Sequence, residues 1–203
     1  PMLSALKSEK NARYWEQEIL SRPNATNGLY DQAKLYLAPL EGSKPLRSEE
    51  VFIPSWAEKL PGVEASQRAY VTFLNKLRAD SFDAMVNGFA KRGKGLTDIE
   101  LKAIANYVNV ATGRGNLGKL AASAEGLSLA FFSPRLVASR FQLLAGQPLY
   151  RGSIQTRTVI AKEYARLAAG LSVVYGLGAL AGATIETDPR SADFGKLKFG
   201  KTR

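Results

Sequence analysis

The sequence has no histidine and no cysteine among its 203 residues. Those two absences exclude Ser-His-Asp and Cys-His nucleophilic centres, zinc sites with His or Cys ligands, thiol redox chemistry and disulfide bonds. Any catalysis would rest on carboxylates, Lys, Tyr, Ser or Thr, at most with an oxygen-liganded metal ion. The absence of cysteine leaves the compartment open, because a chain without thiols is indifferent to redox conditions.

Two pairs of carboxylates are close enough in the sequence to be considered as an acid and a base. Asp80 and Asp83 share one face of a predicted helix, and Asp188 and Asp193 flank a predicted turn. The first pair lies on a highly charged amphipathic helix, where solvated or ion-paired carboxylates are common. Neither pair has a recognisable pocket that would raise a pKa. We therefore predict that the chain is not an enzyme and has no metal, no cofactor and no small-molecule substrate.

Charge is unevenly distributed along a chain whose net charge is +10. Residues 1–112 and 167–203 each carry a net +2, whereas residues 113–166 hold eight basic and two acidic side chains, a net +6. A basic stretch of this kind attracts nucleic acid or anionic lipid. It would equally suit an acidic partner subunit, and composition does not choose between these partners.

The N-terminal third combines one helix with a proline-rich stretch. Residues 3–22 have the pattern of an exposed amphipathic helix, and residues 22–62 hold five of the nine prolines, with a short helix expected only over 29–37. We interpret this long irregular stretch as an extended strap that lies along another surface; the alternative is an ordinary linker packed on its own domain. The predicted domains are therefore residues 1–62 and residues 63–203. The predicted strap anchors are Phe52, Ile53 and Trp56.

Three helices are predicted from hydrophobic periodicity and from capping residues. Residues 63–92 carry apolar side chains at intervals of three and four. Thr97 and Glu100 form a capping box that begins a second helix, and Ser133 with Pro134 begins a third. The side chains expected to face inward are Tyr70, Phe73, Leu74, Leu77, Met85, Val86 and Phe89 in the first helix, Leu101, Ile104, Ala105 and Val108 in the second, and Leu136, Val137, Phe141 and Leu144 in the third.

Further elements complete the prediction of the fold. Helices are expected over residues 117–132 and 153–182, and two short strands over residues 183–187 and 197–199. We therefore predict a mainly α protein, a multi-helix bundle with an extended proline-rich N-terminal strap and a small C-terminal β-hairpin.

Gly113, Gly115 and Gly118 match the pattern G-x-G-x-x-G. A dinucleotide site requires this pattern between a strand and a helix, but here a helix precedes it and no βαβ unit is predicted. We interpret the glycines as residues that permit positive φ in a tight helix–helix turn. The alternative is a weaker anion site, in which Arg114 and the backbone amides before Leu117 bind a phosphate or a carboxylate.

Four arginines follow this motif, namely Arg135, Arg140, Arg151 and Arg157. Basic residues beside apolar helices usually form a solvated face, and nucleic-acid binding requires that they converge on one groove. We expect no aromatic stacking platforms among these arginines, so that contact with DNA would be non-specific. The predicted nucleic-acid or anion contacts are Arg114, Lys119, Arg135 and Arg140.

Residues 167–185 form a run without charge, LAAGLSVVYGLGALAGATI. At about 1.5 Å per residue this run would cross a bilayer core of ~30 Å only marginally. Its small residues have the spacing of closely packed helix pairs. We expect a buried core helix or an oligomer seam, with conditional membrane insertion as the alternative. The glycines assigned to this seam or membrane contact are Gly170, Gly176, Gly178 and Gly182.

Four short motifs together resemble a known family. They are ATGRGNLG at residues 111–118, FFSPR at 131–135, SRF at 139–141 and TDPRSADFGK at 187–196. Over roughly residues 65–203, the sequence resembles the helical large polyvalent-protein-associated domain of giant phage proteins. That family includes internal virion proteins and DNA-ejection proteins.

The resemblance implies a function for which the family supplies no catalytic residue. It implies a non-enzymatic structural module of an internal virion or DNA-ejection protein, which assembles with copies of itself or other virion proteins into a conduit for genome delivery. The implied locations are the virion and then the host cell envelope, with DNA and the host membrane as further partners. Similar chains continue beyond the DFGK motif, so we expect a fragment of a longer polypeptide. The alternative is a non-specific DNA-binding module of a large polyvalent phage protein.

Overall fold

The structure, a computed structural model, describes residues 1–38, 61–91, 95–118, 133–188 and 190–200. The fold is mainly helical, with 71% helix and a small antiparallel two-stranded hairpin at its C-terminal end, as predicted. Contacts divide the chain into two compact units, Pro1–Arg157 and Thr158–Arg203. The division predicted between residues 62 and 63 stays a prediction.

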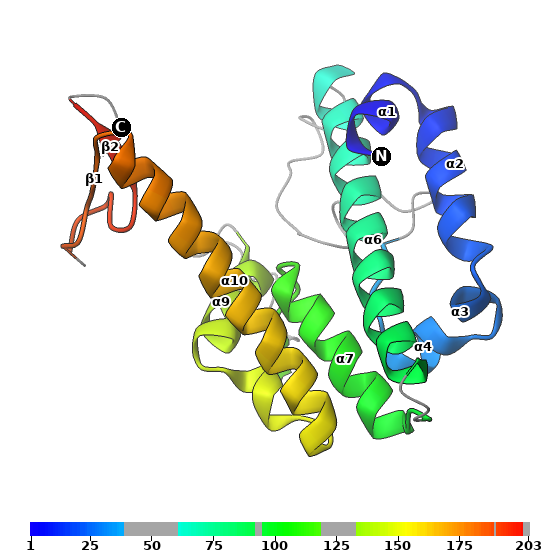
Figure 1. Cartoon of the computed structure of the whole chain (residues 1–203). Coiled ribbons are helices and arrows are strands. Elements are labelled where there is room, and N and C mark those ends of the chain that lie inside the picture. Colours follow the sequence, from blue (N-terminus) through cyan, green and yellow to red (C-terminus); the bar gives the residue numbers. More distant parts are fainter. Residues whose placement is uncertain (39–60, 92–94, 119–132, 189, 201–203) are drawn as a thin grey trace. The chain divides into compact units, whose positions relative to one another are not determined.

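The elements follow one another in a simple order (Figure 1). The first unit contains α1 (Met2–Lys7), α2 (Glu9–Leu20), α3 (Pro23–Thr26), α4 (Leu29–Ala33), α6 (Pro61–Ala90), α7 (Asp98–Ala111), α9 (Pro134–Leu144) and the 3₁₀ helix η3 (Gln147–Tyr150). Helix α10 (Ile154–Leu180) begins in the first unit and continues into the second. The second unit ends with β1 (Ala183–Ile185) and β2 (Leu197–Phe199).

The N-terminal region is more broken than the sequence predicts. The single helix expected over residues 3–22 is two helices, because Ser8 is extended and its hydroxyl accepts the amide of Asn11 at 3.2 Å as the N-cap of α2. The predicted strap is helical through α3 and α4 up to Ala33, and its described residues 35–38 belong to no helix or strand. The predicted anchors Phe52, Ile53 and Trp56 lie outside the described residues.

Helix α6 is the element on which the first unit packs. It contacts α1 and α2 as well as α7, so more than one of its faces is covered (Figure 1). The predicted stripe is right for four of its members and wrong for Tyr70, Phe73 and Leu77, which are about two-fifths exposed. The buried face instead includes the polar residues Asn75 and Arg78, which a search for apolar periodicity cannot find. The buried predicted members are Leu74, Met85, Val86 and Phe89.

The predicted starts of α7 and α9 are both confirmed. In the capping box of α7, Thr97 accepts the amide of Glu100 and the carboxylate of Glu100 accepts the amide of Thr97 at 2.8 Å. Ser133 caps α9 by accepting the amide of Leu136 at 3.2 Å. The whole predicted stripe of α7 is buried. In α9, Leu136 and Val137 are half-buried, but the inward orientation predicted for Phe141 and Leu144 is wrong, since both are more than two-thirds exposed.

The hairpin is held against the second half of α10. Its strands pair antiparallel, with Ala183 opposite Phe199 and Ile185 opposite Leu197. The hydroxyl of Tyr175 on α10 donates to the carbonyl of Gly195 at 2.7 Å. These contacts all lie within the second unit.

We expect Gly115→Ala to lower the stability of the first unit by about 2–3 kcal/mol through overpacking. A Cβ atom at Gly115 would lie 2.3 Å from the backbone nitrogen of Ser139 and 2.6 Å from the carbonyl oxygen of Arg135. The matched control is Gly88→Ala in α6, where a Cβ meets nothing within 4 Å and helix propensity predicts a gain of about 0.5–1 kcal/mol. Thermal unfolding of both variants checks this, and equal midpoints would contradict it.

Candidate functional site

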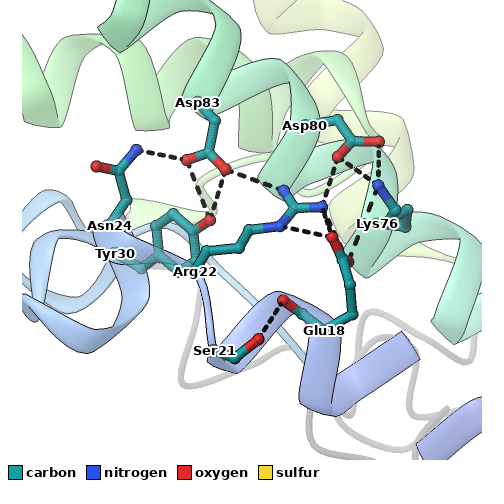
Figure 2. A network of polar contacts seen from close by, with 8 residues as sticks. All are labelled: Glu18, Ser21, Arg22, Asn24, Tyr30, Lys76, Asp80 and Asp83. Carbon is teal, nitrogen blue, oxygen red and sulfur yellow. Dashed lines mark hydrogen bonds and ion pairs between the residues drawn. The ribbon is translucent and has the colours of Figure 1, made fainter. Parts of the chain in front are cut away.

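A cluster of charged side chains joins the end of α2 to α6 (Figure 2). Arg22 lies between α2 and α3, and Asp80 and Asp83 lie three residues apart on one face of α6. The guanidinium of Arg22 donates from Nη1 to Asp83 Oδ2 at 2.9 Å and from Nη2 to Asp80 Oδ1 at 2.7 Å. The same guanidinium donates to both carboxylate oxygens of Glu18, one turn earlier in α2. We call this group of residues the Arg22 network.

The other members of the Arg22 network donate further hydrogen bonds to the two aspartates of α6. Asp83 also accepts from the amide of Asn24 at 2.7 Å and from the hydroxyl of Tyr30 at 2.9 Å. Lys76 donates to both oxygens of Asp80, at 2.7 and 2.9 Å. The ring of Tyr30 packs edge-to-face on Phe82, so the hydroxyl is fixed at the point where the apolar core meets the charges.

Burial and pairing together raise the pKa values of Tyr30 and Arg22 and lower that of Asp80. Burial raises the pKa of Tyr30, and its hydrogen bond to Asp83 raises it further. Burial alone would raise the pKa of Asp80, but the bonds from Lys76 and Arg22 outweigh burial and hold that pKa below its ordinary value. Burial alone would lower the pKa of Arg22, and its carboxylate partners reverse that effect.

This arrangement stabilises the fold and leaves little scope for proton transfer. The guanidinium of Arg22 occupies the point where the three carboxylates meet. Within the ranges that the structure describes, no three acidic side chains are placed to hold a metal ion. The ion-paired role favoured for Asp80 and Asp83 is confirmed. One local sequence signal indicates that Arg22 pairs with a carboxylate, namely its four-residue spacing from Glu18. No sequence signal indicates that Tyr30 belongs to the network.

Two asparagines hold residues 34–38, the segment that follows α4. On α6, Asn75 accepts the amide of Ala38 at 2.9 Å and donates to its carbonyl at 2.7 Å. On α7, Asn109 accepts the amide of Tyr36 and donates to the carbonyl of Lys34, both at 3.0 Å. Each amide side chain therefore pairs with the main chain as a neighbouring strand would, and we call the pair the asparagine clamp.

Tyr36, within the clamped segment, lies beside two arginines. The guanidinium of Arg114 lies 3.1 Å from the ring centre and that of Arg78 lies 5.3 Å from it. Arg78 is almost fully buried and donates from Nε to the hydroxyl of Thr112 at 2.9 Å. Arg114 therefore has a cation–π role within the chain, apart from any contact with an external anion.

The glycine-rich loop is a packed turn, and the positive φ predicted for its glycines is right for Gly113 and Gly118 and wrong for Gly115. Gly113 and Gly118 have φ of +90° and +54°, and Gly115 lies against the backbone of α9. Two of its backbone amides donate to backbone carbonyls, that of Arg114 to Asn109 and that of Gly115 to Arg135. Two others donate to side-chain oxygens, that of Asn116 to Gln142 and that of Gly118 to Asn116. These four amides are thus already used within the chain, which argues against the predicted backbone anion site.

The four predicted contact residues are only partly brought together. The carbonyl of Arg135 accepts the amide of Gly115, so Arg135 and Arg114 lie on neighbouring segments. Arg140 is exposed and lies five residues further along α9, about 140° around the helix. Lys119 lies outside the described residues.

The expectation that no aromatic side chains accompany the arginines is wrong. Phe141 follows Arg140 and is 68% exposed, and Tyr150 precedes Arg151 and is 73% exposed. Arg140, Arg151 and Arg157 are themselves exposed. Hydrophobic periodicity assigned Phe141 to the interior, which concealed this combination.

Helix α10 exposes most of its apolar side chains from residue 167 to its end. Leu167, Leu171, Val174 and Leu177 recur at intervals of three and four and therefore share one side of the helix. The exposed apolar residues of this stretch are Leu167, Leu171, Val173, Val174, Leu177 and Leu180, each at least 49% exposed. The buried core helix predicted as one alternative is not what the structure shows for these residues. Among the described residues, no helix is both long and apolar enough to cross a membrane.

The four glycines assigned to this helix have different roles. A Cβ atom at Gly178 would lie 2.8 Å from the side chain of Leu197, so Gly178 allows the hairpin to pack on α10. Gly182 lies beyond the end of α10 and has φ of +84°, so it ends the helix. A Cβ atom at Gly170 or Gly176 would meet nothing within 4 Å, and these two glycines remain open to a partner.

The comparisons with known proteins give no further guide to the site. No known protein family, no curated protein and no solved structure matches this chain.

We expect Tyr30→Phe to destabilise the first unit by about 1–2 kcal/mol, because Asp83 loses a hydrogen-bond donor in a mostly buried place. Tyr14→Phe is the matched control, since Tyr14 is 62% exposed on α2 and keeps its ring contact with Trp15. The measurement is the free energy of unfolding in urea of the wild type and of both variants. Equal values for the two variants would show that the hydroxyl of Tyr30 has no stabilising role.

Asp80 is expected to contribute stability at neutral pH that is lost in acid. Its pKa is lowered in the folded state, so the contribution is complete above the ordinary aspartate pKa of about 3.9 and disappears as pH falls through the lower folded value. Because the side chain is half-exposed, Asp80→Asn should cost less than about 1 kcal/mol at pH 7.

The measurement for Asp80 is the urea midpoint of both proteins from pH 7 to pH 2.5, with Asp31→Asn on α4 as control. The gap between wild type and Asp80→Asn should close in acid, and at pH 7 it should exceed the gap between wild type and the exposed Asp31→Asn control. A gap that persists undiminished at pH 2.5 would refute the assignment.

Proposed function

We propose that this chain is a non-enzymatic structural module of a phage internal virion or DNA-ejection protein. It assembles with copies of itself or with other virion proteins into a conduit for genome delivery. The observation that carries the assembly role is the exposed apolar side of α10 from Leu167 to Leu180. Soluble proteins rarely expose contiguous apolar surface of this kind unless another surface covers it.

The absence of enzymatic activity is supported by the state of the carboxylates. The three acids of the Arg22 network each accept hydrogen bonds from Arg22. On the hairpin, Asp193 pairs with Lys196 and Asp188 accepts the amide of Arg190. Carboxylates with these roles are poorly suited to acid–base catalysis, which needs a group poised to exchange a proton near the working pH.

The phage setting is supported by the four sequence motifs that resemble the large polyvalent-protein-associated domain. In this setting the chain is packaged in the virion and reaches the host cell envelope after ejection. The open Gly170 lies on the same side of α10 as Val174 and Leu177 and permits a neighbouring helix to approach closely, and the exposed leucines and valines supply the apolar contact. The host membrane is a further partner in this proposal, and DNA is considered below.

The test is the mass of the full chain in solution, by light scattering, at low and high salt. We expect a defined oligomer that survives high salt, because contacts between apolar side chains are not screened by ions. Leu171→Glu combined with Leu177→Glu should dissociate it, since each leucine contributes about 1.5–3 kcal/mol when buried.

Ser172→Glu is the matched control for the assembly test. It places the same charge on α10 about 200° from Val174, where Ser172 donates to the carbonyl of Ala168. This variant should keep the wild-type mass. A monomeric wild-type chain at every salt and protein concentration would overturn assembly through α10.

A further inference from the structure

One stretch of the first unit combines exposed arginines with exposed aromatic rings. Residues 133–157 contain four arginines and no acidic residue. Phe141 and Tyr150 are 68% and 73% exposed, among the most exposed aromatic side chains that the structure describes. We call the group the arginine–aromatic surface, and it consists of Arg140, Phe141, Leu144, Tyr150, Arg151 and Arg157.

Local geometry brings these residues together from three consecutive elements. Arg140, Phe141 and Leu144 lie within about 100° of one another around α9. Gly146, with φ of +67°, turns the chain from α9 into η3, and a Cβ atom built at Gly146 would lie 4.0 Å from the ring of Tyr150. The ring therefore lies directly beyond the exposed end of α9.

The third arginine is fixed beside Tyr150. Arg157, in the first turn of α10, donates from Nη2 to the carbonyl of Tyr150 at 3.2 Å and from Nε to the carbonyl of Gly152 at 3.1 Å. These bonds hold a guanidinium at the main chain of Tyr150 without neutralising its charge, because both acceptors are carbonyl oxygens.

Acidic residues near this surface are engaged elsewhere. Glu100 accepts the hydroxyl of Ser153 at 2.7 Å through one oxygen and serves the α7 cap through the other. The next acid along the chain, Glu163, pairs with Arg166. Residues 133–157 themselves contribute four positive charges and no negative one.

We propose that the arginine–aromatic surface binds single-stranded nucleic acid. Phe141 and Tyr150 would stack on unpaired bases, while Arg140, Arg151 and Arg157 contact the phosphates. Stacking platforms set among cations are the chemistry that recognises single strands, and they are sequence-tolerant because every base has an aromatic face. A duplex offers the same phosphates but keeps its bases stacked, so it would use only the arginines.

An anionic membrane fits this surface less well. Interfacial helices segregate a continuous apolar face from a charged one. Here each ring is adjacent in sequence to an arginine, at Arg140–Phe141 and at Tyr150–Arg151. This inference goes beyond the proposed assembly function and does not rest on it, because none of its residues lies on the exposed side of α10 from Leu167 to Leu180.

The experiment is fluorescence anisotropy of a labelled 20-nucleotide oligothymidylate titrated with the full chain at several salt concentrations. We expect binding at low salt that is tighter than to a duplex of the same length. Phe141→Ala and Tyr150→Ala should each weaken binding about tenfold. Tyr14→Ala, which removes an exposed ring from α2, should have no effect.

The arginines are tested through the salt dependence. Arg140→Gln combined with Arg151→Gln should reduce the slope of log affinity against log salt by about 1.4, at about 0.7 per lost phosphate contact. Lys10→Gln, on the exposed side of α2, is the charge control and should leave the slope unchanged. All variants should keep the wild-type unfolding midpoint, because the replaced side chains are exposed.

Three results would overturn the proposal. They are no binding at low salt, equal affinity for duplex and single strand with no effect of removing the rings, and binding to anionic phosphatidylserine vesicles without binding to the oligonucleotide. The Leu171→Glu, Leu177→Glu variant separates this proposal from assembly, since it should lose the oligomer and keep its intrinsic affinity for the oligonucleotide.

Discussion

The first unit depends on one guanidinium, that of Arg22, which holds carboxylates from two helices at once. Glu18 belongs to α2, whereas Asp80 and Asp83 belong to α6. An arginine suits this position better than a lysine, because its planar fork donates in several fixed directions. With Arg22 in place, the short helices α3 and α4 are fixed relative to α6, and Tyr30 reaches both the core and Asp83. The position of the clamped segment follows from that arrangement.

Local signals predicted those parts of the fold that are decided locally. Thr97 with Glu100, and Ser133 with Pro134, begin helices through contacts within one turn, so their sequence patterns were sufficient. The pairing of Arg22 with Asp83 spans 61 residues and depends on how α2 meets α6, which no local pattern encodes. The buried face of α6 was misjudged for a related reason, since Asn75 and Arg78 are interior residues that interact with distant segments.

For the candidate surfaces, too, local sequence patterns do not determine which side chains are exposed. A run such as residues 167–185 reveals its apolar character in the sequence, but whether other elements cover it is a property of the tertiary structure. Phe141 has the spacing of an inward residue on α9, yet the loop around Gly115 packs on the Arg135–Ser139 part of that helix instead. The aromatic ring is left exposed beside Arg140. Residues chosen for their charge alone, such as Arg114, were in part committed to contacts within the chain.

The asparagine clamp has a consequence for how the chain tolerates sequence change. All four of its hydrogen bonds go to main-chain atoms of Lys34, Tyr36 and Ala38. The clamp therefore fixes the path of the backbone, and its hydrogen bonds do not depend on which side chains that segment carries. Substitution along this segment is compatible with the clamp, except by proline at Tyr36 or Ala38, because proline lacks the donor amide. Two asparagines on other helices thus set the path of the backbone after α4, whereas the side chains of the segment are constrained by separate contacts, such as that of Tyr36 with Arg114.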